Sequence, residues 1–317
     1  MKKHFCAVFV IFLIIFLSSC QTVQKAEDGL KEANSIDVGI THGVSRPDPT
    51  LRELTYDGNP IELEYYMHNR AGQQRWGLQI FVNGFQQPFY VDNSSFPSIQ
   101  FCSDFEDRQE KFFKIKFTPI FGEKGDILDI HFIVMLNPTY TILAPTENSS
   151  YMANHTITQI TGWHLIMNED ISEKQPDSLA LEPSASIKLE ERKNKSTDLA
   201  FNLYVNEKLV NLIRIDPAVP LKLSIGVLGY NKELQQTPLY RISVYTNHQI
   251  INCFNGSYYA DIDISKAHDS LLLYDLEINT SALKKSYGNI YVIAVPIANK
   301  CTDTFPVIIK SRSLPLV

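Results

Sequence analysis

Ile61-Glu-Leu-Glu-Tyr-Tyr66 and Ile127-Leu-Asp-Ile-His-Phe-Ile-Val-Met-Leu136 are the two stretches that decide the fold. The first alternates apolar and polar side chains, which is the period of a half-buried strand. The second is a short, nearly continuous apolar run that contains β-branched residues. Leu78–Asn83 and Phe113–Phe117 are similar, and Gly, Pro, Asn or Asp bound each run. We therefore expect β-strands rather than helices in this part of the chain.

Short polar segments between these runs predict turns. Gly122-Glu-Lys-Gly-Asp126 supplies two glycines between Phe113–Phe117 and Ile127–Leu136, so we expect a hairpin there. In the C-terminal half, Lys284–Gly288 separates Leu273–Ile278 from Ile290–Ile297 in the same manner. The sequence thus predicts a closing hairpin in each half.

The two halves also share earlier pieces. Ile187-Lys-Leu-Glu-Glu-Arg192 resembles Ile61–Tyr66, and Phe201–Asn206 resembles Leu78–Asn83. Two related β domains in tandem are the simplest account of these matches. The alternative is chance, because alternating strands resemble one another.

The predicted fold class is all-β, with two tandem β-sandwich domains of the immunoglobulin-like kind. Jelly-roll and other sandwich topologies fit the same strand pattern. The predicted division is a signal peptide at residues 1–20, a polar tether at 21–50, a first sandwich at 51–167, a linker at 168–184 and a second sandwich at 185–317.

The first twenty residues have the layout of an export signal. Lys2 and Lys3 are basic, and Phe5–Leu17 is apolar without a charge. This run is shorter than the roughly 20 residues that a permanent membrane helix needs. We therefore expect a targeting segment, and an extracytoplasmic compartment for the rest of the chain.

Leu17-Ser18-Ser19-Cys20 resembles the lipobox of bacterial lipoproteins, in which two small residues precede the cysteine that is acylated and becomes the mature N-terminus. The resemblance implies a lipid on Cys20, with fatty acyl chains such as palmitate holding the protein on the cell membrane or outer membrane. Each buried methylene adds about 0.8 kcal/mol of membrane affinity, so two or three chains give a stable anchor. The alternative is an ordinary secretory signal that is cleaved nearby.

Charge and cysteine content limit the partners and the chemistry. Without Lys2 and Lys3, 27 basic side chains face 35 acidic ones, which argues against nucleic acid as a partner. No metal or cofactor is predicted, because the histidines and cysteines have no metal-ligand spacing. An exported compartment permits disulfides, and Cys253 and Cys301 are the candidate pair.

Nucleophile motifs such as Gly-x-Ser-x-Gly are missing from the sequence, so no catalytic residue is proposed. The segment between two predicted strands, Tyr65–Trp76, is rich in the residue types found at recognition surfaces. We therefore predict a ligand-binding loop with Tyr66, Arg70, Arg75 and Trp76.

The sequence as a whole indicates a membrane-anchored bacterial surface lipoprotein that acts as a non-enzymatic binding or structural module. Its partners would be the membrane, through the lipid, and another envelope protein or a surface ligand. Two alternatives stay open. One is the solute-binding lipoprotein of a transporter, although no βαβ alternation is visible. The other is a glycosidase-type enzyme on a β scaffold, with two carboxylates about 5–10 Å apart in a cleft.

Overall fold

A computed structural model describes residues 39–45, 52–140, 155–188, 199–216, 218–229, 239–280, 283, 288–297 and 307–317. These residues form β-strands and turns, with no α-helix among the described elements. Accordingly, the described ranges hold no helix with the length and hydropathy that a membrane span requires. Residues Ile40–Val317 form one compact unit.

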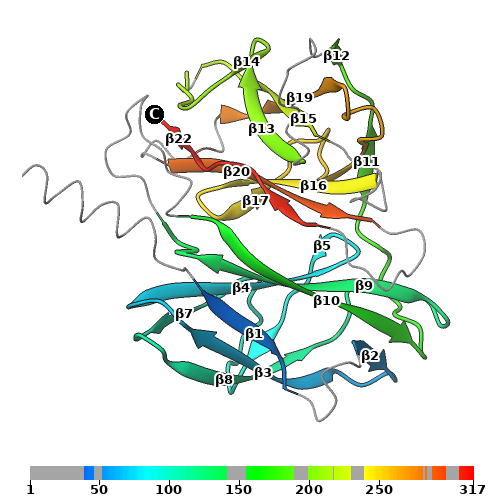
Figure 1. Cartoon of the computed structure of the whole chain (residues 1–317). Coiled ribbons are helices and arrows are strands. Elements are labelled where there is room, and N and C mark those ends of the chain that lie inside the picture. Colours follow the sequence, from blue (N-terminus) through cyan, green and yellow to red (C-terminus); the bar gives the residue numbers. More distant parts are fainter. Residues whose placement is uncertain are drawn as a thin grey trace, which may run out of the picture. The chain divides into compact units, whose positions relative to one another are not determined.

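The first sandwich consists of two sheets, here called sheet I and sheet II (Figure 1). Sheet I contains, in spatial order, β1 (Ile40–Val44), β3 (Ile61–Asn69), β8 (Glu110–Phe117) and β6 (Tyr90–Val91). Sheet II contains β2 (Glu53–Tyr56), β10 (Ile157–Met167), β9 (Ile127–Leu136), β4 (Gln74–Val82) and β5 (Phe85–Gln86), with β7 (Phe101–Phe105) also paired to β4. These orders match the ABED and GFC sheets of immunoglobulin domains, and β2 is added in parallel to β10.

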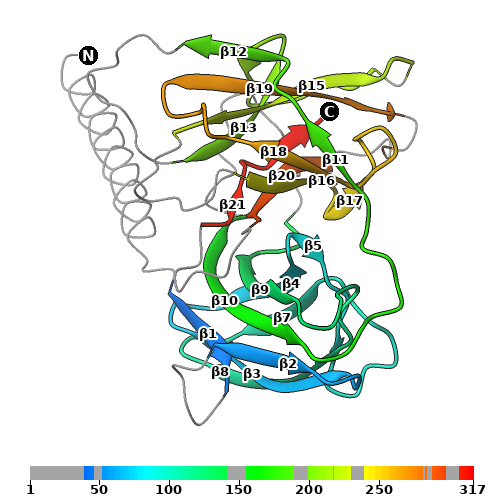
Figure 2. The same ribbon diagram turned by 90° about the vertical axis from the view of Figure 1, so that its right-hand side faces the viewer.

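The second sandwich consists of sheets III and IV (Figure 2). Sheet III contains β11 (Ser178–Leu181), β18 (Tyr259–Asp263), β16 (Leu239–Thr246), β20 (Gly288–Pro296) and β21 (Ile309–Lys310); β17 (Gln249–Ile251) pairs with β16, and β22 (Leu314–Leu316) with β20. Sheet IV contains β12 (Ala185–Lys188), β19 (Ser270–Ile278), β15 (Leu221–Leu228), β13 (Ala200–Val205) and β14 (Lys208–Leu209). The predicted fold class, all-β with tandem immunoglobulin-like sandwiches, is confirmed.

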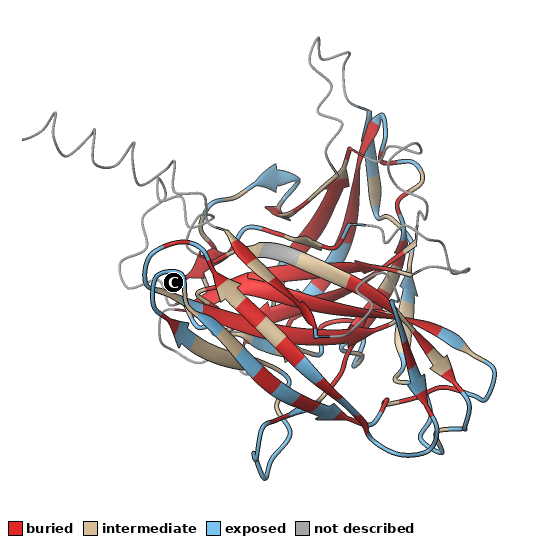
Figure 3. Ribbon diagram, turned by 60° about the horizontal axis from the view of Figure 1, so that its bottom comes forward, coloured by how far each residue is buried: buried red, intermediate tan, exposed pale blue. Residues whose placement is uncertain are grey.

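Side-chain alternation explains how each pair of sheets forms a core. In β3, the residues Ile61, Leu63 and Tyr65 point inward and are buried, whereas Glu62 and Glu64 are exposed. The inward residues of β3 pack against inward residues of sheet II such as Phe132, whose ring stacks on Tyr65. Figure 3 shows buried residues concentrated in the central strands. The hydrophobic effect therefore holds the sheets face to face.

The predicted hairpins are wrong, because the strands concerned belong to different sheets. β8 pairs with β3 and β6, whereas β9 pairs with β10 and β4, so Gly122–Asp126 crosses between the two sheets. β19 and β20 are likewise divided between sheets IV and III. The apolar run of β9 reflects a central strand that is buried on both faces.

The matches proposed between the halves are not structurally equivalent either. Ile187 lies in the edge strand β12, whereas Ile61 begins the internal strand β3. Phe201 belongs to β13, which pairs with β15, whereas Leu78 belongs to β4, which pairs with β9. By position in the sheets, β15, β16, β19 and β20 correspond to β3, β4, β8 and β9. Local alternation alone does not fix which strands are neighbours.

Two strands lie where a tether and a linker were predicted. β1, in the predicted tether 21–50, pairs with β3 and buries Ile40 and Val44. β11, in the predicted linker 168–184, pairs in parallel with β18, and Leu179 and Leu181 pack against the second core. Both strands are short edge strands, so their apolar residues were too few to give a clear pattern.

Arg241 of β16 connects the two sandwiches. Its Nε and Nη2 donate to the two carboxylate oxygens of Asp261 at 2.7 Å, and its Nη1 donates to the carbonyl of Asn83 at 2.6 Å. The guanidinium carbon lies 3.7 Å from the centre of the Phe85 ring. Gly84 has a φ of +80°, and a Cβ there would lie 2.8 Å from the Arg241 Cβ. The turn at Asn83 and Gly84 is therefore shaped to receive this arginine.

A second set of contacts between the sandwiches is apolar and lies beside a half-buried lysine, Lys310. Phe81, Ile133 and Met135 of the first sandwich pack with Tyr245 and Tyr291 of the second, among other residues. Lys310 Nζ lies 4.5 Å from the Tyr291 ring centre and donates to the carbonyls of His155 and Ser311 and to Ser313 Oγ. Burial lowers the pKa of Lys310 to about 7. A cation here costs free energy, since no carboxylate forms an ion pair with it in the described ranges.

We predict that Arg241→Met lowers the free energy of unfolding by about 3 kcal/mol, because Asp261 loses its buried partner. Removing one partner of a buried ion pair costs about 3–5 kcal/mol. We expect the lower end of this range, since the Asp261 side chain is 28% exposed. Urea denaturation measures the loss. The double variant Arg241→Met/Asp261→Leu should recover part of it, and additive losses would contradict the pairing.

For Lys310, stability should rise with pH between about pH 7 and 9. The folded-state pKa of about 7 lies below the ordinary value of 10.5, so the unfolded chain binds more protons in this window. Urea denaturation of Lys310→Met should show a smaller slope of unfolding free energy against pH. Exposed Lys222→Met is the matched control, and equal slopes in all three proteins would refute the prediction.

Candidate functional site

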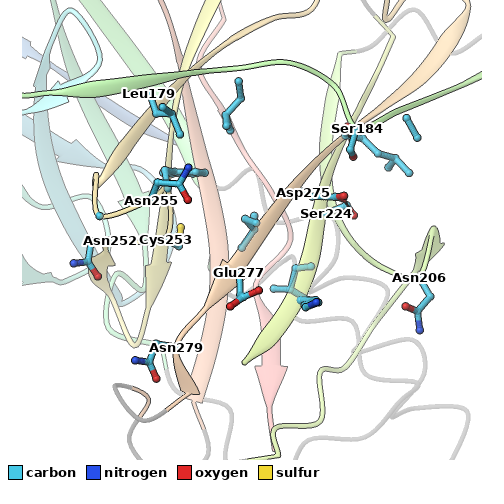
Figure 4. Close-up of a pocket in the computed structure, with 18 of the residues that line it drawn as sticks. Leu179, Ser184, Asn206, Ser224, Asn252, Cys253, Asn255, Asp275, Glu277 and Asn279 are labelled. Atoms are coloured by element: carbon cyan, nitrogen blue, oxygen red, sulfur yellow. Dashed lines mark hydrogen bonds between the residues drawn. The ribbon is translucent and has the colours of Figure 1, made fainter. Parts of the chain in front are cut away.

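The second sandwich has a pocket beside β19 (Figure 4). Its volume is about 810 Å³, within the range of about 300–1,000 Å³ that is typical of ligand sites. Asn206 lies on one side of β19, whereas Asn252 and Asn255 lie on the other (Figure 4). The pocket therefore extends from the outer face of sheet IV around the strand to the flank of the sandwich.

Sheet pairing explains why the pocket exists at this place. β12 pairs only with Ser270–Leu273 of β19, so the rest of that edge has no neighbouring strand among the described residues. In the first sandwich, β6 likewise pairs with only part of the corresponding strand β8, at Ile115 and Lys116. In the second, the nearby strand β18 pairs with β16 in sheet III and not with β19. The flank between β19 and β18 is consequently left open.

The polar lining comes from alternation along two neighbouring strands. Asp275 and Glu277 are the outward residues of β19, and Ser224 and Lys222 lie opposite them on β15. Ser224 Oγ donates to an Asp275 carboxylate oxygen at 2.6 Å. Among the described residues, Glu277 has no hydrogen-bond or ion-pair partner.

Carboxylates and amides dominate the rest of the polar surface. Three acidic side chains line the pocket against one basic side chain, namely Glu207, Asp275 and Glu277 against Lys222. Four carboxamides are added by Asn206, Asn252, Asn255 and Asn279. An acceptor-rich, net negative lining favours a ligand that donates hydrogen bonds and carries positive or no charge.

The apolar lining includes Leu179, Leu181, Cys253 and Phe254. Cys253 is a free, buried thiol, and burial raises its pKa to about 12. It therefore stays protonated near neutral pH, and a protonated thiol is a poor nucleophile. Because Cys301 lies outside the described residues, the predicted bridge between Cys253 and Cys301 stays a prediction.

Two turns with positive φ contribute to the pocket. Asn206 and Glu207 have φ of 50° and 62° between β13 and β14, and Asn255 and Gly256 have 49° and 91°. Positive φ at both central residues is the geometry of a type I′ turn. Asn-Gly is the strongest sequence signal for such a turn, and the turns predicted from the sequence do not include Asn255-Gly256. Glu207 is unusual, because a residue with a Cβ rarely adopts this conformation.

The predicted binding loop does not form a single surface. Trp76 is fully buried, and its indole Nε1 donates to Asn69 Oδ1 at 3.2 Å, so its assignment as a ligand contact is wrong. It fills the core, as a large aromatic residue usually does. Arg75 is exposed, and its Nη1 lies 3.9 Å from Asp104 Oδ1. Arg70 is exposed at the turn. Tyr66 is half-buried on sheet I beside Phe112.

The other predicted site residue, Cys20, lies outside the described residues.

Within the described ranges, no group of three or more His, Cys, Asp or Glu side chains could hold a metal ion. Asp275 and Glu277 lie on one face of one strand and are exposed. A glycosidase places its two acids on either side of the bond that it cleaves. Asp275 and Glu277 instead point to the same side of β19.

No family model matches the sequence, and no curated protein matches it. Among solved structures, the periplasmic chaperone SfaE aligns at 8% identity over 86% of this chain and 98% of that chain, with a TM-score of 0.23. The Salmonella enterica SafA pilin in complex with the SafB chaperone aligns at 13% identity over 87% and 95%, with a TM-score of 0.25. The C-terminal domain of the Streptococcus agalactiae AgI/II polypeptide BspA gives 8% identity over 88% and 99%, with a TM-score of 0.21. These TM-scores are too low to carry an argument, so the fold class rests on the sheets themselves.

We predict that Glu207→Gly raises the free energy of unfolding by up to about 1 kcal/mol, because glycine adopts positive φ without the penalty of a Cβ. Glu207→Ala removes the same charge but keeps the Cβ, so its stability should stay near that of the wild type. Urea denaturation distinguishes the two variants. An equal gain in both would mean that charge, and not backbone conformation, sets the cost.

Proposed function

We propose that this protein is a lipid-anchored, extracytoplasmic binding module of the bacterial envelope, and that the pocket beside β19 is its ligand site. The pocket carries the proposal, because it combines an apolar part with an acceptor-rich polar lining in a volume that suits a ligand. The lipobox-like Leu17–Cys20 supports the anchor. The sandwich scaffold supplies a rigid frame on which loops and strand edges present the binding groups.

A binding role agrees better with the site than catalysis does. A general acid or nucleophile needs a desolvated or activated group. The Asp275 and Glu277 side chains are exposed, and the Cys253 thiol is protonated. Ligand capture requires only complementary groups in fixed positions, which the two paired strands β15 and β19 provide.

The anchor is tested by mass spectrometry of the full chain expressed in a bacterial host, with wild type beside Cys20→Ala. We expect wild type to begin at an acylated Cys20 and to fractionate with membranes. The variant should keep its signal or be released. An unmodified N-terminus in soluble wild-type protein would contradict the anchor.

The ligand site is tested by screening the full chain against short random peptides and against a glycan array. We expect at least one class to bind, and Glu277→Lys to weaken that binding about tenfold or more, since it reverses a charge in the pocket. Glu64→Lys, a charge reversal at an exposed position of β3, is the matched control. Ligands that bind both variants equally well would place the site elsewhere, and hydrolysis of a glycan would indicate an enzyme.

A further inference from the structure

The direction of the β19 backbone identifies what kind of ligand the pocket suits. On one side, Leu272–Ile278 pairs with β15. On the other side, the Leu273 carbonyl accepts hydrogen bonds from the Ser184 backbone N–H at 2.7 Å and from Ser184 Oγ at 3.0 Å. The backbone groups of every second residue in an antiparallel strand point the same way. The N–H and C=O groups of Asp275 and Glu277 therefore point away from β15.

These backbone groups face the open flank. No strand pairs with Tyr274–Ile278 on that side in the described part of the chain. Asp275 and Glu277 also line the pocket, and the turn with Asn252 and Asn255 lies across from them (Figure 4). An uncovered strand edge next to a pocket is a ready template for another strand.

We propose that the open edge of β19 binds an extended peptide segment of a partner protein as an added strand. The inference rests on the proposed function, because it specifies the ligand of the same pocket. Main-chain hydrogen bonds to Asp275 and Glu277 supply the pairing, in the manner of β-strand addition. The uncovered part of β19 is five residues long, about 17 Å at 3.3–3.4 Å per residue.

The side chains beside this edge define the peptide further. Residues of an added strand that lie opposite Asp275 and Glu277 have their side chains on the same face as these two carboxylates. Lysine or arginine at those positions forms favourable cross-strand pairs. The residues in between point to the other face, where Cys253 and Phe254 line the pocket. The segment therefore alternates basic and apolar residues.

A glycan fits these observations less well. Sugars are commonly held against the exposed faces of aromatic rings, and the one aromatic residue that lines the pocket in the described ranges, Phe254, is 3% exposed. A saccharide also leaves the directed row of backbone groups without the regular partners that a peptide supplies.

The test measures binding of a labelled Lys-Val-Lys-Val-Lys peptide to the full chain by fluorescence polarisation. We expect the Lys-Val-Lys-Val-Lys peptide to bind saturably. Binding of a Glu-Val-Glu-Val-Glu peptide should be about tenfold weaker or absent. A Lys-Val-Lys-Val-Lys peptide with N-methylated amides on the pairing side should not bind, because it keeps the charge but cannot form the ladder. Equal binding of the N-methylated peptide would overturn the proposal.

A protein variant separates backbone pairing from charge. Glu277→Pro removes the N–H that faces the flank, and proline is tolerated where the N–H of an edge strand is unpaired. We expect this variant to fold and to lose peptide binding, whereas Glu277→Gln keeps most of it. Circular dichroism checks the fold of both. If Glu277→Pro is unfolded, the result with the N-methylated peptide alone decides whether the peptide binds by strand addition.

These measurements distinguish failure of strand addition from failure of the pocket as a ligand site. If the peptides do not bind but a glycan does, and Glu277→Lys abolishes that binding, the pocket is a ligand site and strand addition is wrong. If no peptide or glycan depends on Glu277, both proposals fail.

Discussion

The need to pair backbone N–H and C=O groups is the constraint on which this structure depends. Each sandwich satisfies it within two sheets, and side-chain alternation then places one face of each sheet in the core. Pairing is unequal along β19, which β15 covers on one side but β12 covers only at Ser270–Leu273 on the other, among the described residues. The pocket, its polar lining and the proposed strand addition all follow from that unequal pairing.

Arg241 links the contact between the sandwiches to the walls of the pocket. It lies directly opposite Asp261 in the β16–β18 pair, and Ser178 Oγ of β11 donates to the same carboxylate at 2.9 Å. One partly buried ion pair therefore ties three strands of sheet III together, and its arginine reaches the Asn83 carbonyl of the first sandwich. β11 leads into the segment with Ser184 at the pocket, so the chain connects this ion pair with the pocket lining.

Sequence reasoning predicted the fold class because alternation in β3 and apolar runs such as β9 report burial directly. It could not assign neighbours, and so it predicted hairpins where the chain crosses between sheets at Gly122–Asp126. It also chose Trp76 as a ligand contact, because residue type alone does not distinguish a core aromatic from an exposed one. The pocket was missed, since Ser224, Asp275 and Asn206 are far apart in the sequence and only pairing brings them together. The Asn255-Gly256 turn was the one local signal available.

Amide hydrogen exchange of the free, full-length protein measures whether the edge of β19 is open. Because the backbone of alternate β19 residues points in opposite directions, we predict slow exchange for the Tyr274 and Leu276 amides, which face β15, and fast exchange for those of Asp275 and Glu277. Equal, strong protection of all four amides would mean that the edge of β19 is already covered, and strand addition at this edge would then be wrong.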